Sequence, residues 1–81
     1  MKVNYYTKYG CGLCDEGLSL LRRFAEIDIR IIDVEDDVDK FASYLHRIPV
    51  ISCDNGKKEL AWPFDEEDIR KLVLHSRPGN A

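Results

Sequence analysis

The chain has 81 residues, of which 44% are hydrophobic and 33% are charged. This length favours one compact domain and excludes a two-domain enzyme with a substrate cleft between its lobes. The formal net charge of -3 lacks the basic excess that nucleic-acid binding needs, and no apolar run approaches the roughly 18 residues of a membrane-spanning helix. We therefore expect a monomeric globular protein with no nucleic-acid partner and no membrane partner.

The start of the chain and its cysteines indicate a compartment. Residues 1–6 contain one lysine but no apolar segment behind it, so they do not resemble a secretory signal peptide. We therefore expect a cytoplasmic protein. The three cysteines are Cys11, Cys14 and Cys53. In a reducing compartment, two cysteines separated by two residues are more typical of catalysis or metal binding than of a structural disulfide.

The first half of the chain alternates between strand-like and helix-like patterns. Residues 2–7 are rich in Val, Tyr and Thr, which predicts a strand. Residues 12–25 predict a helix, because apolar side chains recur there at helical spacing. In residues 27–34 isoleucines alternate with Asp28 and Arg30, which is the period of a half-buried strand. The predicted helical stripe consists of Cys14, Leu18, Leu21 and Ala25.

An acidic run from Asp33 to Asp39 precedes the next predicted helix, residues 36–45. Carboxylates at a helix start interact favourably with the positive end of the helix dipole, so the run is interpreted as a solvated helix start. A calcium loop would need a glycine and a ligand spacing that this run lacks. The apolar spacing that predicts the helix comes from Val38, Phe41, Ala42 and Leu45.

Two strands follow, at residues 49–53 and 57–62. They are separated by Asp54, Asn55 and Gly56, and an Asn-Gly pair supplies the positive φ angles that a tight hairpin turn needs. The sequence therefore predicts a β-hairpin at this position.

The last helix begins after Pro63. Asp65 is expected to cap it together with Asp68, and Phe64 and Ile69 are placed as a hydrophobic staple around this start. Residues 76–81 contain Pro and Gly and are expected to form a flexible tail.

The predicted order is β-α-β-α-β-β-α, which corresponds to an α/β fold. The first two strands, joined through a helix, should be parallel with a right-handed crossover. A four-stranded mixed sheet flanked by three helices, with helices on both faces, is the natural packing. We assign residues 1–75 to this single domain.

Cys11 and Cys14 lie where the first strand meets the first helix. The helix N-terminus carries free N–H groups and a partial positive charge, which favour a thiolate at Cys11. Lys8 adds a nearby positive charge, and Gly12 lets the backbone approach a partner closely. Cys14 lies one turn deeper on the same edge. This spacing indicates a redox pair in which Cys11 attacks and Cys14 resolves.

Two other interpretations of the cysteine pair were weighed. A zinc site needs four ligands, and Cys53, His46 and His75 are the only further cysteines or histidines, without a second closely spaced pair. The two cysteines of the pair could also pack simply as small apolar residues. The histidines lie near predicted helix C-termini, where a cation interacts well with the dipole.

The segment from Tyr6 to Cys14 resembles the active-site segment of glutaredoxins, in which a strand ending in Tyr-Ser/Thr-Lys is followed by C-x-x-C. The stretch 48–50 resembles the cis-proline landmark of that family, and the stretch 60–65 resembles the end of short bacterial glutaredoxin-like proteins. The resemblance covers residues 2–75. It implies a thioredoxin fold and dithiol–disulfide exchange by Cys11 and Cys14. The residues that it and the local chemistry place at the substrate are Lys8, Gly12, Leu13, Ile48, Pro49 and Val50.

The sequence departs from the glutaredoxin pattern at two places. Gly12-Leu13 replaces the usual Pro-Tyr between the cysteines. The Gly-Gly pair that normally precedes the glutathione-binding Asp is absent, and Trp62, Pro63 and Phe64 stand before Asp65 instead. We therefore expect no bound cofactor, with glutathione or a thiol reductase as candidate electron donors and a protein or small-molecule disulfide as substrate.

The leading hypothesis is a small dithiol–disulfide oxidoreductase. The alternatives are a binding module that keeps the same fold with little turnover, which the missing glutathione motif favours, and a metal or iron–sulfur carrier. Cys53 is expected to be a buried small residue, while Trp62 fits either the core or a partner surface.

Overall fold

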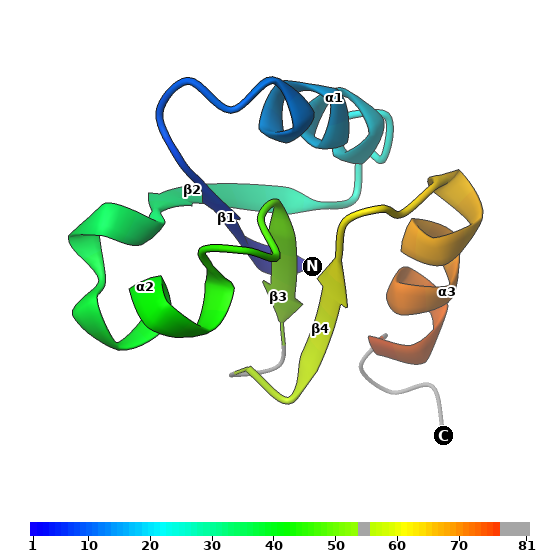
Figure 1. The fold of residues 1–81 in the computed structure, drawn as a ribbon. Coiled ribbons are helices and arrows are strands. Elements are labelled where there is room, and N and C mark those ends of the chain that lie inside the picture. Colours follow the sequence, from blue (N-terminus) through cyan, green and yellow to red (C-terminus); the bar gives the residue numbers. More distant parts are fainter. Residues whose placement is uncertain (54–55, 77–81) are drawn as a thin grey trace.

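The computed structural model describes residues 1–53 and 56–76. Its order of strands and helices confirms the expected succession, with one short 3-10 helix (η1) added (Figure 1). The elements are β1 (Lys2–Thr7), α1 (Gly12–Leu21), β2 (Asp28–Asp33), η1 (Val34–Asp36), α2 (Val38–Tyr44), β3 (Val50–Cys53), β4 (Lys58–Ala61) and α3 (Glu66–Ser76).

Within the described residues, four strands form one mixed sheet in the order β2-β1-β3-β4. β1 pairs with β2 in parallel and with β3 antiparallel, and β3 pairs antiparallel with β4. Tyr5 lies opposite Ile31 on one side and Ile51 on the other, which places β1 in the interior of the sheet. The parallel first pair and the final hairpin are as the sequence predicts.

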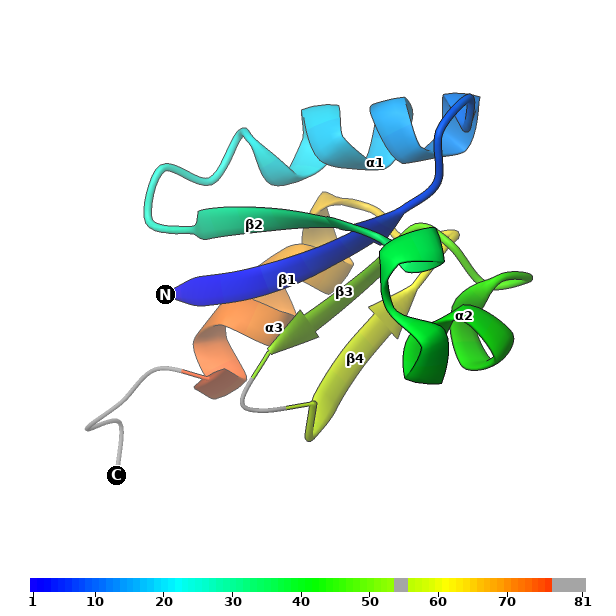
Figure 2. The ribbon, with the colours of Figure 1, turned by 90° about the vertical axis from the view of Figure 1, so that its left-hand side faces the viewer.

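Helices cover both faces of the sheet. Successive side chains of a strand point to opposite faces, so Tyr5 and Tyr6 of β1 enter different cores. Tyr5 belongs to a core that it shares with residues of α1 and α3, whereas Tyr6 belongs to a second core that it shares with Tyr44 of α2. Figure 1 shows α2 and α3 on opposite sides of the β3–β4 hairpin, and Figure 2 shows α1 lying along β1 and β2. The expected two-sided packing is confirmed.

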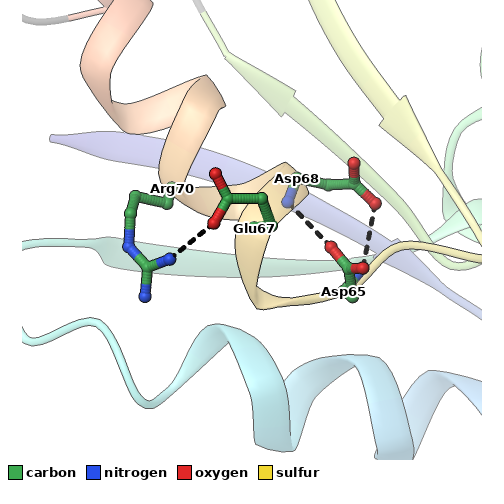
Figure 3. Close-up of polar contacts among 4 residues, drawn as sticks. All are labelled: Asp65, Glu67, Asp68 and Arg70. Atoms are coloured by element: carbon green, nitrogen blue, oxygen red, sulfur yellow. Dashed lines mark hydrogen bonds and ion pairs between the residues drawn. The ribbon is translucent and has the colours of Figure 1, made fainter.

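The start of α3 has the predicted capping arrangement. The Asp68 N–H donates to the Asp65 side chain at 2.9 Å, and the Asp65 N–H donates back to the Asp68 side chain at 3.0 Å (Figure 3). Phe64 and Ile69 are both buried in the first core, as a hydrophobic staple requires. One turn later, Arg70 bonds to Glu67 at 2.7 Å on the exposed surface.

The first helix ends four residues earlier than predicted. After Leu21 the chain tightens into three-residue turns, because the Arg23 and Phe24 N–H groups bond to carbonyls three residues back. These turns carry Phe24 and Ile27 onto the core and leave Ala25 exposed. Ala25, the last residue of the predicted apolar stripe, is therefore not part of the core.

The predicted apolar stripe of the second helix is wrong. Val38 is 86% exposed and Phe41 is 37% exposed, while Tyr44 is the buried residue of α2. The helix has seven residues, and Tyr44 is the one that joins the second core against the sheet. The 3-10 helix η1 lies between β2 and α2 and overlaps the range predicted as helix only at Asp36, and its Val34, predicted to end the strand, is fully buried.

Other boundaries differ by one or two residues, and Pro49 precedes β3 instead of starting it. Gly56 has a φ of 84°, as the predicted hairpin turn needs, while residues 54–55 lie outside the described ranges. Ser76 belongs to α3 and not to the tail predicted over residues 76–81, of which residues 77–81 lie outside the described ranges. Among the helices of the described ranges, none combines the length and apolarity that crossing a bilayer requires.

Candidate active site at the start of the first helix

A tight turn connects β1 to α1. The Cys11 N–H donates to the Lys8 carbonyl at 3.2 Å, and Gly10, between them, has a φ of 78°. A positive φ at the third position is what a type II turn requires, and glycine adopts it without steric cost. The turn places Cys11 at the N-cap of α1.

The two cysteines have different surroundings. Cys11 is half-buried and its Sγ accepts a hydrogen bond from the Cys14 N–H at 3.2 Å, as an N-cap side chain does. Cys14 is only 4% exposed. Burial, followed by a side-chain hydrogen bond with Cys11, raises the pKa of the Cys14 thiol to about 12. Both cysteines are free thiols in this structure. The arrangement thus presents one accessible sulfur at a helix start and one buried thiol beneath it.

A surface cavity of about 390 Å³ opens beside the cysteine pair. Lys8 lines it together with Cys11 and Cys14, so the structure brings three of the predicted site residues together. Ile31 of the edge strand β2 also faces this space and is 51% exposed. The other lining residues are Thr7, Tyr9, Gly10, Asp15 and Leu18.

Gly12 and Leu13 lie on the first turn of α1 outside this cavity. Both are exposed, and Leu13 leaves 47% of its surface accessible next to the N-cap cysteine. They add exposed surface next to Cys11 beyond the residues that line the cavity.

The segment 48–50 lies outside the cavity lining as well. The Ile48–Pro49 peptide bond is cis, and so is Trp62–Pro63. Pro49 and Val50 are fully buried, and the Pro49 carbonyl accepts a hydrogen bond from the Trp62 N–H at 3.0 Å. Ile48 alone of the three keeps a partly exposed side chain. A role of this segment in substrate binding stays a prediction.

A buried tyrosine of β1 forms a hydrogen bond to the backbone of α1 at Cys14. Tyr5 has no exposed surface, and its hydroxyl donates to the Cys14 carbonyl at 2.7 Å. Gly17 of α1 lies against the same hydroxyl: a Cβ at this position would approach the Tyr5 oxygen to less than 3.0 Å and would lie 3.0 Å from Phe64 Cζ. The absence of a side chain at Gly17 therefore allows this hydrogen bond.

Sequence reasoning did not identify Tyr5, Ile31, Asp15 or Leu18 as site residues. The isoleucine alternation of β2 suggested a buried Ile31, whereas the side chain lines the cavity. The glycine inside the predicted first helix was an available signal, because a glycine within a helix lowers stability unless close packing requires it.

Other residues with chemistry-bearing side chains lie elsewhere. Cys53 is buried, as expected, and Trp62 is half-buried and packs edge-on against Phe64 with 5.1 Å between ring centroids. His46 and His75 are exposed. In the part of the chain that the structure describes, no three His, Cys, Asp or Glu residues are grouped so that they could hold a metal ion.

Comparison with known proteins agrees with the fold described above. The family model described as Glutaredoxin-like domain (DUF836) matches residues 2–74. The crystal structure of the target protein XcR50 from X. campestris is 27% identical, with a TM-score of 0.81 over 93% of this chain and 99% of that one. Its solution structure gives 27% identity and a TM-score of 0.80 over 95% and 97% of the two chains.

Thioredoxin 1 from Thermosipho africanus TCF52B shares the fold at 24% identity, with a TM-score of 0.63 over 95% of this chain and 100% of that one. No curated protein was found to match the chain. The family match over nearly the whole chain shows that the chain, whose β-α-β-α-β-β-α topology is that of a thioredoxin-like fold, belongs to the glutaredoxin-like domain family (DUF836).

Proposed function

We propose that the protein is a dithiol–disulfide oxidoreductase in which Cys11 attacks a substrate disulfide and Cys14 resolves the mixed disulfide. The observation that carries this proposal is the inequality of the two thiols. Cys11 is accessible at the N-cap and accepts the Cys14 N–H, while Cys14 is buried with a pKa raised to about 12. Because the thiolate is the reactive form, the order of attack follows from this inequality.

The exchange proceeds in two balanced steps. The Cys11 thiolate attacks one sulfur of the substrate disulfide, a bond forms between Cys11 and that sulfur, and the other sulfur leaves as a thiolate that takes a proton from water. Cys14 then attacks the Cys11 sulfur, the mixed disulfide breaks, and the departing substrate thiolate receives the Cys14 proton. The substrate gains two electrons, and the protein is left with a Cys11–Cys14 disulfide. A dithiol reductase or two glutathione molecules would return it to the dithiol.

The surface around Cys11 suits a disulfide that is presented from outside. Lys8 lines the cavity and contributes positive charge there, and the exposed Leu13, two residues after Cys11, contributes apolar contact outside the cavity. Gly12 is exposed, and nothing lies within 4 Å of the position of its missing Cβ, so a substrate backbone can approach it. We assign substrate contact to these residues and to Ile48, with Pro49 and Val50 contributing through the shape of the backbone that they fix.

Reduction of insulin disulfides in the presence of dithiothreitol tests the proposal. We expect the protein to accelerate the reduction, Cys11→Ser to abolish the acceleration, and Cys53→Ser to retain it as the matched control. Acceleration that persists in Cys11→Ser would contradict the assignment. A folded wild-type protein that does not exceed dithiothreitol alone would favour a binding module of the same fold.

A further inference from the structure

The peptide groups on either side of Cys14 are both held by side chains. The Cys14 N–H donates to Cys11 Sγ at 3.2 Å, and the Cys14 carbonyl accepts from the Tyr5 hydroxyl at 2.7 Å. The first bond connects Cys14 to its partner in the redox pair. The second connects it to β1, which lies inside the sheet between β2 and β3.

The position of the Tyr5 hydroxyl is closely defined by its surroundings. The side chain has no exposed surface. Around the place where a Gly17 Cβ would stand, the Tyr5 oxygen, Phe64 Cζ and Pro49 Cγ converge, the last two at 3.0 and 3.2 Å from that place. The hydroxyl therefore occupies space that only a glycine at this position of α1 leaves open, and it has little room to move away from the Cys14 carbonyl.

The Tyr5 hydroxyl remains a donor over the whole range in which disulfide exchange is studied. Burial raises the pKa of Tyr5 well above its ordinary value, and the neighbouring Cys14 and Cys11 raise it further. The hydrogen bond to the carbonyl thus persists when the sulfur chemistry of the neighbouring cysteines changes with pH.

We propose that Tyr5 is a positioning residue for the resolving step: its hydrogen bond fixes the Cys14 backbone to the sheet, so that the buried thiol stays within reach of a mixed disulfide at Cys11. This inference rests on the proposed function. An anchored group reacts as if at a high effective concentration, and freedom to move away lowers the rate. The attack by Cys11 on an external disulfide does not require the Cys14 carbonyl, so Tyr5 acts on the second step alone.

Dithiobis-nitrobenzoate separates the two steps, because each one releases a coloured thiolate. With protein in excess over the reagent, the first release reports attack by Cys11 and the second reports resolution by Cys14. The second rate should be independent of protein concentration, and Cys14→Ser should give the first release only. Tyr5→Phe removes the hydroxyl and keeps the ring. Tyr6→Phe is the matched control, because Tyr6 is the neighbouring buried tyrosine on the opposite face of the sheet.

We expect Tyr5→Phe to slow the second release about fivefold, equivalent to ~1 kcal/mol, the usual worth of a hydrogen bond. The first release should stay within about twofold of wild type, and Tyr6→Phe should leave both rates unchanged. A purely structural role would lower the melting temperature without changing the ratio of the two rates.

An unchanged or faster second release in folded Tyr5→Phe overturns the positioning role, and so does an equal slowing in Tyr6→Phe. A wild-type protein that releases no thiolate through Cys11 overturns the proposed function together with this inference. The two failures are therefore distinguishable, since the first leaves exchange at Cys11 intact.

Discussion

Replacing Gly17 by alanine adds one methyl group to the buried side of α1 and should destabilise the protein. Alanine is the better helix former by about 1 kcal/mol, so the substitution would stabilise an open site. At Gly17, however, the new Cβ would approach the Tyr5 oxygen to less than 3.0 Å. Overpacking of this kind costs about 1–3 kcal/mol, and displacing the hydroxyl from the Cys14 carbonyl costs about 1 kcal/mol more.

The net expectation is a loss of about 1–3 kcal/mol in the free energy of unfolding, because the helix propensity gain offsets only part of these costs. In a Tyr5→Phe background the nearest remaining neighbours are Phe64 Cζ at 3.0 Å and Pro49 Cγ at 3.2 Å, which need to shift by only a few tenths of an ångström. The same Gly17→Ala change should then cost about 1 kcal/mol or less. The double-mutant cycle should therefore show a coupling of about 1 kcal/mol or more between the two positions.

Urea unfolding followed by tryptophan fluorescence measures these differences, since Trp62 is the single tryptophan and packs against Phe64. Gly12→Ala is the matched control: Gly12 lies in the same helix, and nothing lies within 4 Å of its Cβ position. This control should be neutral or slightly stabilising. A neutral Gly17→Ala, or a destabilisation that is unchanged by Tyr5→Phe, would refute the reasoning.

Three further predictions concern the site and the last helix. In Cys11→Ser, iodoacetamide should modify Cys14 slowly at neutral pH, and the rate should continue to rise above the ordinary thiol pKa of about 8.5, because burial is the largest cause of the raised pKa and the substitution leaves it in place. A plateau of the rate near that ordinary value would contradict this account. Asp65→Ala should lower the melting temperature above pH 4 more than in strong acid. The hydrogen bond from the Asp68 N–H lowers the pKa of the Asp65 carboxyl in the folded protein. The stabilisation that this carboxylate gives the fold is therefore present above its pKa in the unfolded chain, and it is lost as the pH falls through its pKa in the folded protein. A difference in melting temperature between wild type and Asp65→Ala that does not depend on pH would argue against the cap. Gly10→Ala should cost about 1–2 kcal/mol, because an L-residue at a φ of 78° is strained, and equal stability in urea unfolding would show that the turn relaxes.

The capping pair at α3 and the cysteine pair at α1 were predictable because each depends on a local rule. An N-cap side chain reaches an N–H three residues on, whatever the rest of the fold does. The same holds for Cys11, whose sulfur accepts the Cys14 N–H at the predicted helix start. Likewise, the order of strands and helices follows from residue periods that extend over whole elements.

The predictions that were wrong concern which face of a helix or strand is buried against the rest of the protein. Val38 and Phe41 have helical spacing, yet α2 attaches to the sheet through Tyr44 and leaves Val38 86% exposed. Ile31 has strand spacing, yet it lies on the edge strand where a cavity beside the cysteines replaces packing. Apolar residues have the same spacing in the sequence whether their face is buried or exposed. Only the tertiary arrangement therefore decides which of them are buried.

The contact between Tyr5 and Gly17 shows the same limit at the site. The two residues are twelve positions apart, and neither belongs to a motif that carries chemistry. Their relation appears only when β1 and α1 are packed, because the tyrosine hydroxyl fills the space of the missing side chain. A glycine inside a predicted helix indicates that another segment packs closely against the helix there. It does not indicate which residue that segment contributes.

The claim that Cys11 is the attacking thiol is tested most directly by the mass of intact Cys14→Ser protein after incubation with hydroxyethyl disulfide, followed by peptide mapping. Without its resolving partner, the protein should accumulate one mixed disulfide, and the adduct should map to Cys11. A folded protein that gains no adduct, or an adduct on buried Cys53 with Cys11 unmodified, would contradict the account.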